Sequence, residues 1–436
     1  MEYLKRHWNP ETSEYPALLM RAASTGGADR EAVSAILKGV KEGGDAALLG
    51  YTEQFDQVAG IALKVAPGEI EAAHTKVGDD LKAALAVAKA NIEAFHAAQL
   101  PDGERVMNGA IELWRRVVPI QRVGLYVPGG SAPLVSTVLM LAIPARTAGC
   151  RSIALCTPPN RAGAIDPAIL YAADLCGVEE IYKVGGAQAI AALAYGTETI
   201  AAVDKIYGPG NSWVTEAKSQ VGSSVCAIDL PAGPSEVMVA VTSDADPTFV
   251  AADLLSQAEH GSDSQAMLVV LGDKEAGFAF LDRVEGQIEP LLGRLSRSSE
   301  VRSSLAQSRA FVIPSLEKVA DLINAYAPEH LIIALDSEDE ELELLALVHN
   351  AGSVFLGPWS PESSGDYASG TNHTLPTAGW ARSYSGLSVD SFVKKITVQR
   401  LSEAALRDLA PTVAAMANAE GLDAHRLAVD VRLEER

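Results

Sequence analysis

Cysteine and basic residues are scarce in this 436-residue chain, and each shortage excludes a class of protein. The four cysteines contain no C-x-x-C pair, so we expect reduced, buried thiols and neither a disulfide framework nor a structural zinc site. The 35 Lys and Arg residues are outnumbered by 56 Asp and Glu residues, which gives a formal net charge of -21. That charge argues against a nucleic-acid partner and an anionic membrane, because both attract clustered cations.

Long hydrophobic runs are also missing. The longest, residues 138–145, is far shorter than the roughly 20 residues that a membrane-spanning helix needs. The opening residues, "MEYLKRHWNPETSEYP", have no apolar signal core. We therefore expect a cytoplasmic protein without a membrane partner.

The chain is instead rich in strands that alternate with helices. Residues 29–99 have apolar positions spaced three and four apart, which predicts helices, whereas short apolar strands and longer helices alternate from residue 122 onward. This pattern predicts an α/β protein with two tandem doubly wound, incomplete Rossmann-like parallel-sheet domains. We expect an N-terminal helical region (residues 1–121) that packs on the second α/β domain, and a first α/β domain at residues 122–234. A second α/β domain would follow at residues 235–379, and a C-terminal helical arm at residues 380–436.

Glycine-rich loops follow three predicted strands of the first α/β domain. The stretches "YVPGGSAP", "VGGAQA" and "YGPGNS" each leave backbone N–H groups free between a strand and a helix. Such groups bind phosphates, although none of the loops matches G-x-G-x-x-G. The three loops together predict a nucleotide site at the carboxyl ends of these strands.

Four of the eight histidines stand beside other polar groups. His260 follows Gln257 at the end of a predicted helix, and His373 shares a loop, "SSGDYASGTNHTLPT", with an aspartate. His425 lies near the C-terminus, and His330 follows a glutamate in "AYAPEHLIIAL". Nitrogen and oxygen ligands without thiolates suit a divalent metal of zinc type, but their spacing does not select the ligands. The adjacent glutamate and histidine also have an ordinary interpretation, as residues of a short helical turn after a proline.

Together these segments resemble the histidinol dehydrogenase family over residues 20 to 430. The motifs that carry the resemblance are "VGLYVPGGSAPLVSTVLMLAIPARTAGC", "VGGAQAIAALAYGT", "IYGPGN", "DLPAGPSE", "DLLSQAEHG", "YAPEHL" and "GDYASGTNHTLPT". One departure is Gly261, where many relatives carry Asp; it matches no ligand position.

The resemblance implies roles for individual residues. It assigns the catalytic bases to Glu329 and His330, and one zinc ion per subunit to Gln257, His260, Asp366 and His425. The substrate would contact all six of these residues together with Ser235, His373 and Glu420. NAD would contact Tyr126, Gln188 and Asn211, so that residues 122–234 would bind the cofactor and residues 235–379 would carry the zinc and the bases.

The implied reaction is the zinc-dependent oxidation of L-histidinol to L-histidine through L-histidinaldehyde with two NAD, the last step of histidine biosynthesis. Two oxidations explain two adjacent bases, because His330 can accept the alcohol proton and Glu329 can activate water on the aldehyde. The resemblance also implies a homodimer in which Glu420 and His425 on the arm complete the partner's site.

Three alternatives stay open. A relative could oxidise another small polar alcohol, such as a sulfonated diol, although Glu420 suits a cationic substrate better than an anionic one. A metal-dependent hydrolase could use Glu329 to activate water, which would leave the glycine loops without a purpose. A non-catalytic binding protein would not need the paired bases. Manganese or cobalt would accept the same ligands as zinc.

Overall fold

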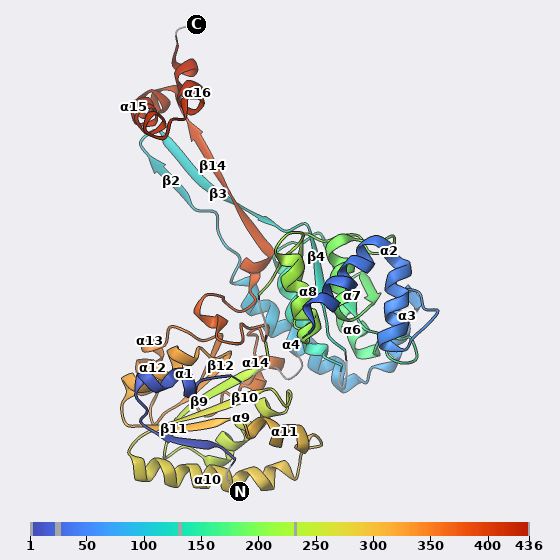
Figure 1. The fold of residues 1–436 in the computed structure, drawn as a ribbon, viewed down its shortest axis with the longest axis vertical. Coiled ribbons are helices and arrows are strands. Elements are labelled where there is room, and N and C mark those ends of the chain that lie inside the picture. The colour runs from blue at the N-terminus through green and yellow to red at the C-terminus, as the bar shows by residue number, and fades with distance from the viewer. Residues whose placement is uncertain (1–2, 22–27, 130–132, 231–232, 435–436) are drawn as a thin grey trace.

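The computed structural model describes residues 3–21, 28–129, 133–230 and 233–434, and it confirms an α/β fold with two parallel sheets (Figure 1). All four cysteines are buried and free, as predicted. No helix within these ranges is long and apolar enough to cross a membrane. The predicted loop around residues 130–132 and the turn around residues 231–232 lie partly outside the described residues.

The first parallel sheet has the strand order β6-β5-β4-β7-β8. The chain enters at β4 in the middle, moves outward through β5 and β6, and returns to the other side for β7 and β8, which is doubly wound topology. Helices α5 and α6 cover one face, and α7 and α8 cover the other. The elements are β4 (Arg122–Tyr126), α5 (Val135–Thr147), β5 (Ser152–Thr157), α6 (Pro167–Leu175), β6 (Glu180–Lys183), α7 (Gly186–Tyr195), β7 (Lys205–Tyr207), α8 (Ser212–Gly222) and β8 (Ala227–Ile228).

The second parallel sheet repeats this winding with the order β1-β11-β10-β9-β12-β13. Its central strand β9 is buried along its whole length, with Val239 packed on one face and Met238 on the other. The elements are β9 (Glu236–Thr242), α9 (Pro247–Ala258), β10 (Gln265–Leu271), α10 (Lys274–Leu292), α11 (Ser298–Leu305), β11 (Arg309–Ile313), α12 (Leu316–Tyr326), β12 (His330–Ala334), α13 (Glu338–Leu347), β13 (Ser353–Leu356) and α14 (Glu362–Tyr367).

The N-terminal region packs differently from our expectation. Only its first part joins the second sheet, through β1 (Lys5–Trp8), which pairs with β11, and through α1 (Tyr15–Leu18), which follows η1 (Thr12–Glu14) and packs on one face. The prediction that residues 1–121 pack on the second domain is otherwise wrong, because α2 packs on α7 and α8, α3 on α6, and α4 on α5 of the first domain. The apolar stripe of α2, which includes Val33 and Val40, fits the apolar surface of α7. These helices are α2 (Arg30–Asp56), α3 (Pro67–Lys76) and α4 (Asp79–Ala97).

The C-terminal arm is only partly helical, which corrects the prediction of a helical arm. After η2 (Trp380–Arg382) and η3 (Val389–Phe392), strand β14 (Val393–Leu401) pairs antiparallel with β3 (Ile111–Pro119), which also pairs with β2 (Arg105–Asn108). This sheet extends away from both parallel sheets and carries α15 (Glu403–Glu420) and α16 (Asp423–Leu433) at its far end (Figure 1). The division of the chain at residues 121, 234 and 379 stays a prediction.

Candidate active site

His330 is the first residue of β12, which lies between β9 and the edge strand β13 of the second sheet, and Glu329 directly precedes it. Helix α12 ends at Ala327, which has a left-handed backbone with φ of 54°, so the chain turns sharply into Pro328 and the strand. Both side chains are almost completely buried. Doubly wound sheets usually bind ligands at the carboxyl ends of their strands, whereas the two candidate bases lie at the amino ends.

Ser235 and Glu236, at the amino end of the neighbouring strand β9, hold the carboxylate of Glu329. The Ser235 hydroxyl donates to Glu329 Oε2 at 2.6 Å, and the Glu236 N–H donates to the same oxygen at 3.0 Å. Burial raises the pKa of Glu329 to about 7, and the nearby His330 and these two hydrogen bonds oppose that shift. A carboxyl with this pKa can act as a base or an acid near neutrality.

The imidazole of His330 is surrounded by acceptors. Its Nδ1 lies 3.3 Å from the Glu236 carbonyl oxygen and 3.6 Å from Glu329 Oε2, and its Nε2 lies 3.5 Å from Asp366 Oδ1. Burial alone lowers the pKa of His330, but the carboxylates of Glu329, Asp366 and Glu362 outweigh it and raise the pKa to about 10. The ring stacks on Phe355 with centroids 6.2 Å apart, which fixes its orientation.

Three of the four predicted metal ligands come from adjacent elements. Gln257 is in the last turn of α9, His260 follows that helix, and Asp366 is on α14 close enough to His260 for their charges to interact. The amide oxygen and nitrogen of Gln257 are buried without a hydrogen-bond partner among the described residues. An unpartnered buried amide needs a ligand, so this donor set fits a metal ion.

The fourth predicted ligand is not part of this cluster. His425 is exposed on α16 and Glu420 is exposed at the end of α15, both on the arm that extends away from the second sheet (Figure 1). The described residues contain no group of three His, Cys, Asp or Glu that could hold a metal. Within one chain the predicted metal site is therefore incomplete.

His373 lies between α14 of the second parallel-sheet region and α5 of the first. Its Nδ1 is 3.0 Å from the Asp366 carbonyl oxygen, and its Nε2 is 3.3 Å from the hydroxyl of Thr137 on α5 of the first unit. Burial lowers the pKa of His373, which favours the neutral imidazole. This predicted substrate residue therefore adjoins the Asp366 cluster.

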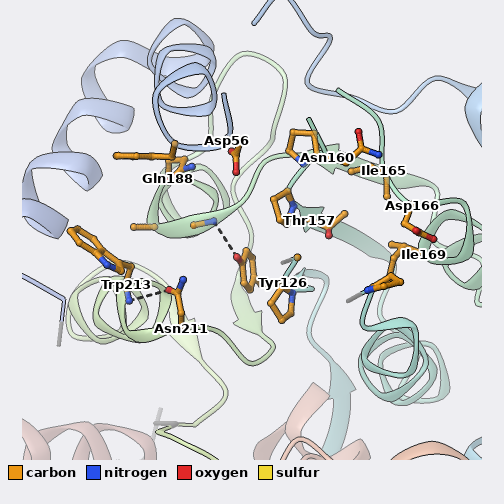
Figure 2. A pocket seen from close by; sticks show the side chains of 18 of the residues that line it. Asp56, Tyr126, Thr157, Asn160, Ile165, Asp166, Ile169, Gln188, Asn211 and Trp213 are labelled. Carbon is orange, nitrogen blue, oxygen red and sulfur yellow. Dashed lines mark hydrogen bonds between the residues drawn. The ribbon is translucent and has the colours of Figure 1, made fainter. Parts of the chain in front are cut away.

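The three predicted cofactor residues line one pocket of about 790 Å³ at the carboxyl ends of the strands of the first sheet. The Tyr126 hydroxyl accepts a hydrogen bond from the Gly186 N–H at 3.1 Å, and Gln188 lies in the first turn of α7 (Figure 2). Asn211 caps α8, since its Oδ1 accepts from the N–H groups of Trp213 and Val214, each at 3.1 Å. Two helix N-termini and their loops thus border a pocket large enough for a dinucleotide.

Two residues that the sequence did not single out support the site. Arg21 pairs with Glu236 through two hydrogen bonds, of 2.5 and 2.7 Å, and so anchors the residue that contacts both candidate bases. Glu362 has an Oε2 atom 4.0 Å from His330 Nδ1. In the sequence, Glu362 is indistinguishable from an ordinary acidic residue in the first turn of a helix, and Arg21 lies far from the site along the chain.

Known proteins resemble this chain over almost its whole length. The family model described as histidinol dehydrogenase matches residues 19–433. The chain is 50% identical to histidinol dehydrogenase of Bacteroides fragilis over 428 residues, covering 98% of each chain. It is 51% identical to histidinol dehydrogenase of Mannheimia succiniciproducens over 426 residues, covering 97% of each chain.

A solved structure extends the likeness to the fold. The crystal structure of histidinol dehydrogenase from Elizabethkingia anophelis aligns with a TM-score of 0.95 at 47% identity, covering 99% of this chain and 98% of that chain. Sequence and fold therefore agree over almost the whole length of the chain. This chain belongs to the histidinol dehydrogenase family of oxidoreductases.

Proposed function

We propose that this protein catalyses the zinc-dependent oxidation of L-histidinol to L-histidine through L-histidinaldehyde, with two NAD. The observation that carries the proposal is the position of the two buried bases, Glu329 and His330, beside Asp366. Two bases with different environments suit a reaction in which a proton must be removed from an alcohol and then from water.

The metal would be held by Gln257, His260 and Asp366 of one subunit and by His425 of the partner subunit, with one zinc ion per subunit. Zinc would supply a Lewis-acidic template for the nitrogen groups of the substrate, and so would help to position its alcohol carbon. Glu420 on the same arm would offer a carboxylate to the cationic substrate. The exposure of Glu420 and His425 in the single chain supports a homodimer with shared sites.

His330 would act first. A metal ion held by Asp366 would offset one of the negative charges that keep the imidazole protonated, and so favour its neutral form. The neutral imidazole would then take the hydroxyl proton of histidinol while the carbon would give a hydride to the first NAD, and the products would be the aldehyde, NADH and one proton. Ser235 and the Glu236 N–H hold the Glu329 carboxylate so that it can remove a proton from the water that attacks the aldehyde. The hydrated aldehyde then loses its second hydride to another NAD, His330 again accepts the hydroxyl proton, and the product is the acid.

NAD would occupy the pocket of the first unit, with Tyr126, Gln188 and Asn211 as contacts. The pocket lies at the carboxyl ends of the strands, where doubly wound sheets bind nucleotides. We also place the protein in the cytoplasm, because four buried free thiols suit a reducing compartment.

The test is a count of products. Purified protein with zinc, histidinol and excess NAD should form two NADH for each histidine, measured by absorbance at about 340 nm and by amino-acid analysis. Removal of the metal by a chelator should abolish NADH formation, and added zinc should restore it. Hydrolysis of an amide or ester without NADH formation would instead favour a metal-dependent hydrolase.

A further inference from the structure

A carboxylate that the proposed mechanism does not use lines the cofactor pocket of the first unit. Asp56 is the last residue of α2, and its side chain points into the pocket (Figure 2). Its Oδ2 atom is buried without a hydrogen-bond partner among the described residues, and burial raises the pKa of Asp56. An acid in the last turn also opposes the helix dipole, which favours cations there. Asp56 therefore costs stability in the free protein, and a ligand of the pocket would explain its presence.

The end of α2 lies beside the loop that follows β5. A Cβ atom added to Gly163 in this loop would lie 2.7 Å from Ile61 Cγ2 and 3.3 Å from Val58 Cγ1, so the chain directly after Asp56 packs on the loop. In Rossmann-type sheets an acid at the end of the second strand hydrogen-bonds the adenosine ribose of NAD. Here the second strand is β5, which contains no acid and ends at Thr157, followed by two prolines. Asp56 thus supplies from α2 the carboxylate that β5 lacks.

The direction in which a dinucleotide would lie follows from the positions of the helices and the candidate bases. The N-termini of α7 and α8 border the pocket with the positive ends of their dipoles, which suit the pyrophosphate. The nicotinamide ring has to reach His330 in the second unit, whereas α2 lies on the side of the first unit remote from the second sheet (Figure 1). The adenosine half is therefore left to the side that Asp56 lines. Its ribose carries two adjacent hydroxyl groups, which match the two oxygens of a carboxylate.

The charges around this side of the pocket bear on the choice between NAD and NADP, which carries a phosphate on the 2′-hydroxyl of that ribose. The phosphate would bring nearly two negative charges to the Asp56 carboxylate. Among the described residues that line the pocket, Arg161 is the only Lys or Arg, and it is exposed in the loop after β5. Asp166 also lines the pocket, but its Oδ1 caps α6 by accepting from the Ala168 N–H at 2.8 Å. Asp56 is thus the lining acid whose buried oxygen is available to a ligand.

We infer that Asp56 is the residue that selects NAD over NADP, by accepting hydrogen bonds from the 2′- and 3′-hydroxyls of the adenosine ribose. The inference rests on the proposed function, because it requires NAD to occupy this pocket. The ribose hydroxyls supply the donors that Asp56 Oδ2 lacks in the free protein. A 2′-phosphate removes one of these donors and places like charges together, so NADP binds about a hundredfold less tightly than NAD.

The test gives the zinc-loaded, full-length protein three cofactors: NAD, NADP and 2′-deoxy-NAD, which lacks the 2′-hydroxyl of the adenosine ribose. With histidinol at saturation, the wild type should favour NAD about a hundredfold over NADP in kcat/KM, and about tenfold over 2′-deoxy-NAD. Asp56→Asn keeps the shape of the side chain but removes its charge. The variant should raise KM for NAD about tenfold, with the loss in KM and not in kcat, and lower the preference for NAD over NADP about tenfold. It should also discriminate less between NAD and 2′-deoxy-NAD, and calorimetric Kd values should follow the same order without turnover.

The matched control is Glu53→Gln, since Glu53 is an exposed acid about one turn earlier in α2 and is not among the residues that line the pocket. It should leave all of these constants unchanged. Without cofactor, Asp56→Asn should unfold at the same urea concentration as the wild type or a higher one, because it removes a buried carboxylate that has no partner. Lost stability with an unchanged preference among the cofactors would overturn the inference, because that result assigns Asp56 a purely structural role.

A second comparison needs no variant. Wild-type protein that binds NADP or 2′-deoxy-NAD as tightly as NAD would also overturn the role of Asp56. Wild-type protein that binds NAD with the expected preference but forms no NADH from histidinol would support that role and overturn the proposed function instead. Wild-type protein that does not bind NAD would overturn both.

Discussion

Replacing Arg21 with alanine removes one partner of a buried ion pair that supports the candidate active site. Arg21 donates to both carboxylate oxygens of Glu236 and to the carbonyl of Tyr326, and its guanidinium lies 4.1 Å from the centroid of the Tyr326 ring. The Glu236 side chain is 3% exposed, so in the variant its charge stays buried without a cation. Breaking such a pair destabilises a protein by about 3–5 kcal/mol. The 23% exposure of Arg21 places the expected loss near the lower limit, at about 3 kcal/mol.

The assay is equilibrium unfolding in urea, followed by circular dichroism and extrapolated to water. Arg302→Ala is the control, because Arg302 forms an equally bidentate pair with Glu289, at 2.6 and 2.8 Å, but both side chains are about half exposed. An exposed pair contributes about 0–1 kcal/mol, so the control should lose much less stability. The double variant Arg21→Met with Glu236→Gln should recover part of the loss, since it removes both buried charges.

Equal losses of stability in Arg21→Ala and Arg302→Ala would refute this reasoning. The Arg21→Ala variant should also turn over more slowly, because Glu236 contacts both Glu329 and His330 through its backbone. Slower turnover without lost stability would mean that the ion pair positions the site but does not stabilise the fold.

Three further predictions concern the proposed function. Glu329→Gln should lower kcat by about 10²–10⁴-fold. Wild-type kcat should fall as the pH drops through about 7, since the Glu329 carboxylate, with its raised pKa, is protonated below that pH. The same fall of kcat with pH in Glu329→Gln would contradict the role of Glu329 as the base. Mixing inactive His330→Asn and His425→Ala subunits after denaturation should restore about a quarter of wild-type NADH formation, because half of the dimers are hybrids with one intact site; no recovery would argue against the shared site. Asn211→Ala should raise KM for NAD and, through loss of the helix cap, lower the free energy of unfolding by about 1 kcal/mol. The control is Ser402→Ala, since Ser402 caps α15 on the arm, away from the pocket; it should lose similar stability without a change in KM for NAD. An unchanged KM for NAD in Asn211→Ala would remove Asn211 from the cofactor site.

Local sequence patterns were sufficient to predict most of the parallel sheets. The strands β4 to β6 and β9 to β13 are short apolar runs bounded by turn residues, and helices of ten or so residues separate most of them. The glycine loops also pointed to the carboxyl ends of the first sheet, where the pocket with Tyr126 and Asn211 lies. Such features are visible in the sequence because they depend on residues close together in the chain.

The antiparallel sheet of the arm was not predictable in the same way. Strand β14 has lysines at two adjacent positions and is mostly exposed, so it lacks the alternation of a half-buried strand. It forms because its backbone pairs with β3, a segment near residue 115. Likewise, β1 becomes a strand of the second sheet only through its pairing with β11.

The sequence by itself determined the α/β class, the order of strands and helices, and the motif that places Glu329 next to His330. Only the tertiary structure decided that α2 to α4 cover the first sheet, that the two bases lie at the amino ends of the second sheet, and that Arg21 and Glu362 reach them. The reason is that secondary structure depends mainly on residues close together in the chain. The burial of a side chain and its ion-pair or hydrogen-bond partners depend on surfaces that meet only after the chain has folded.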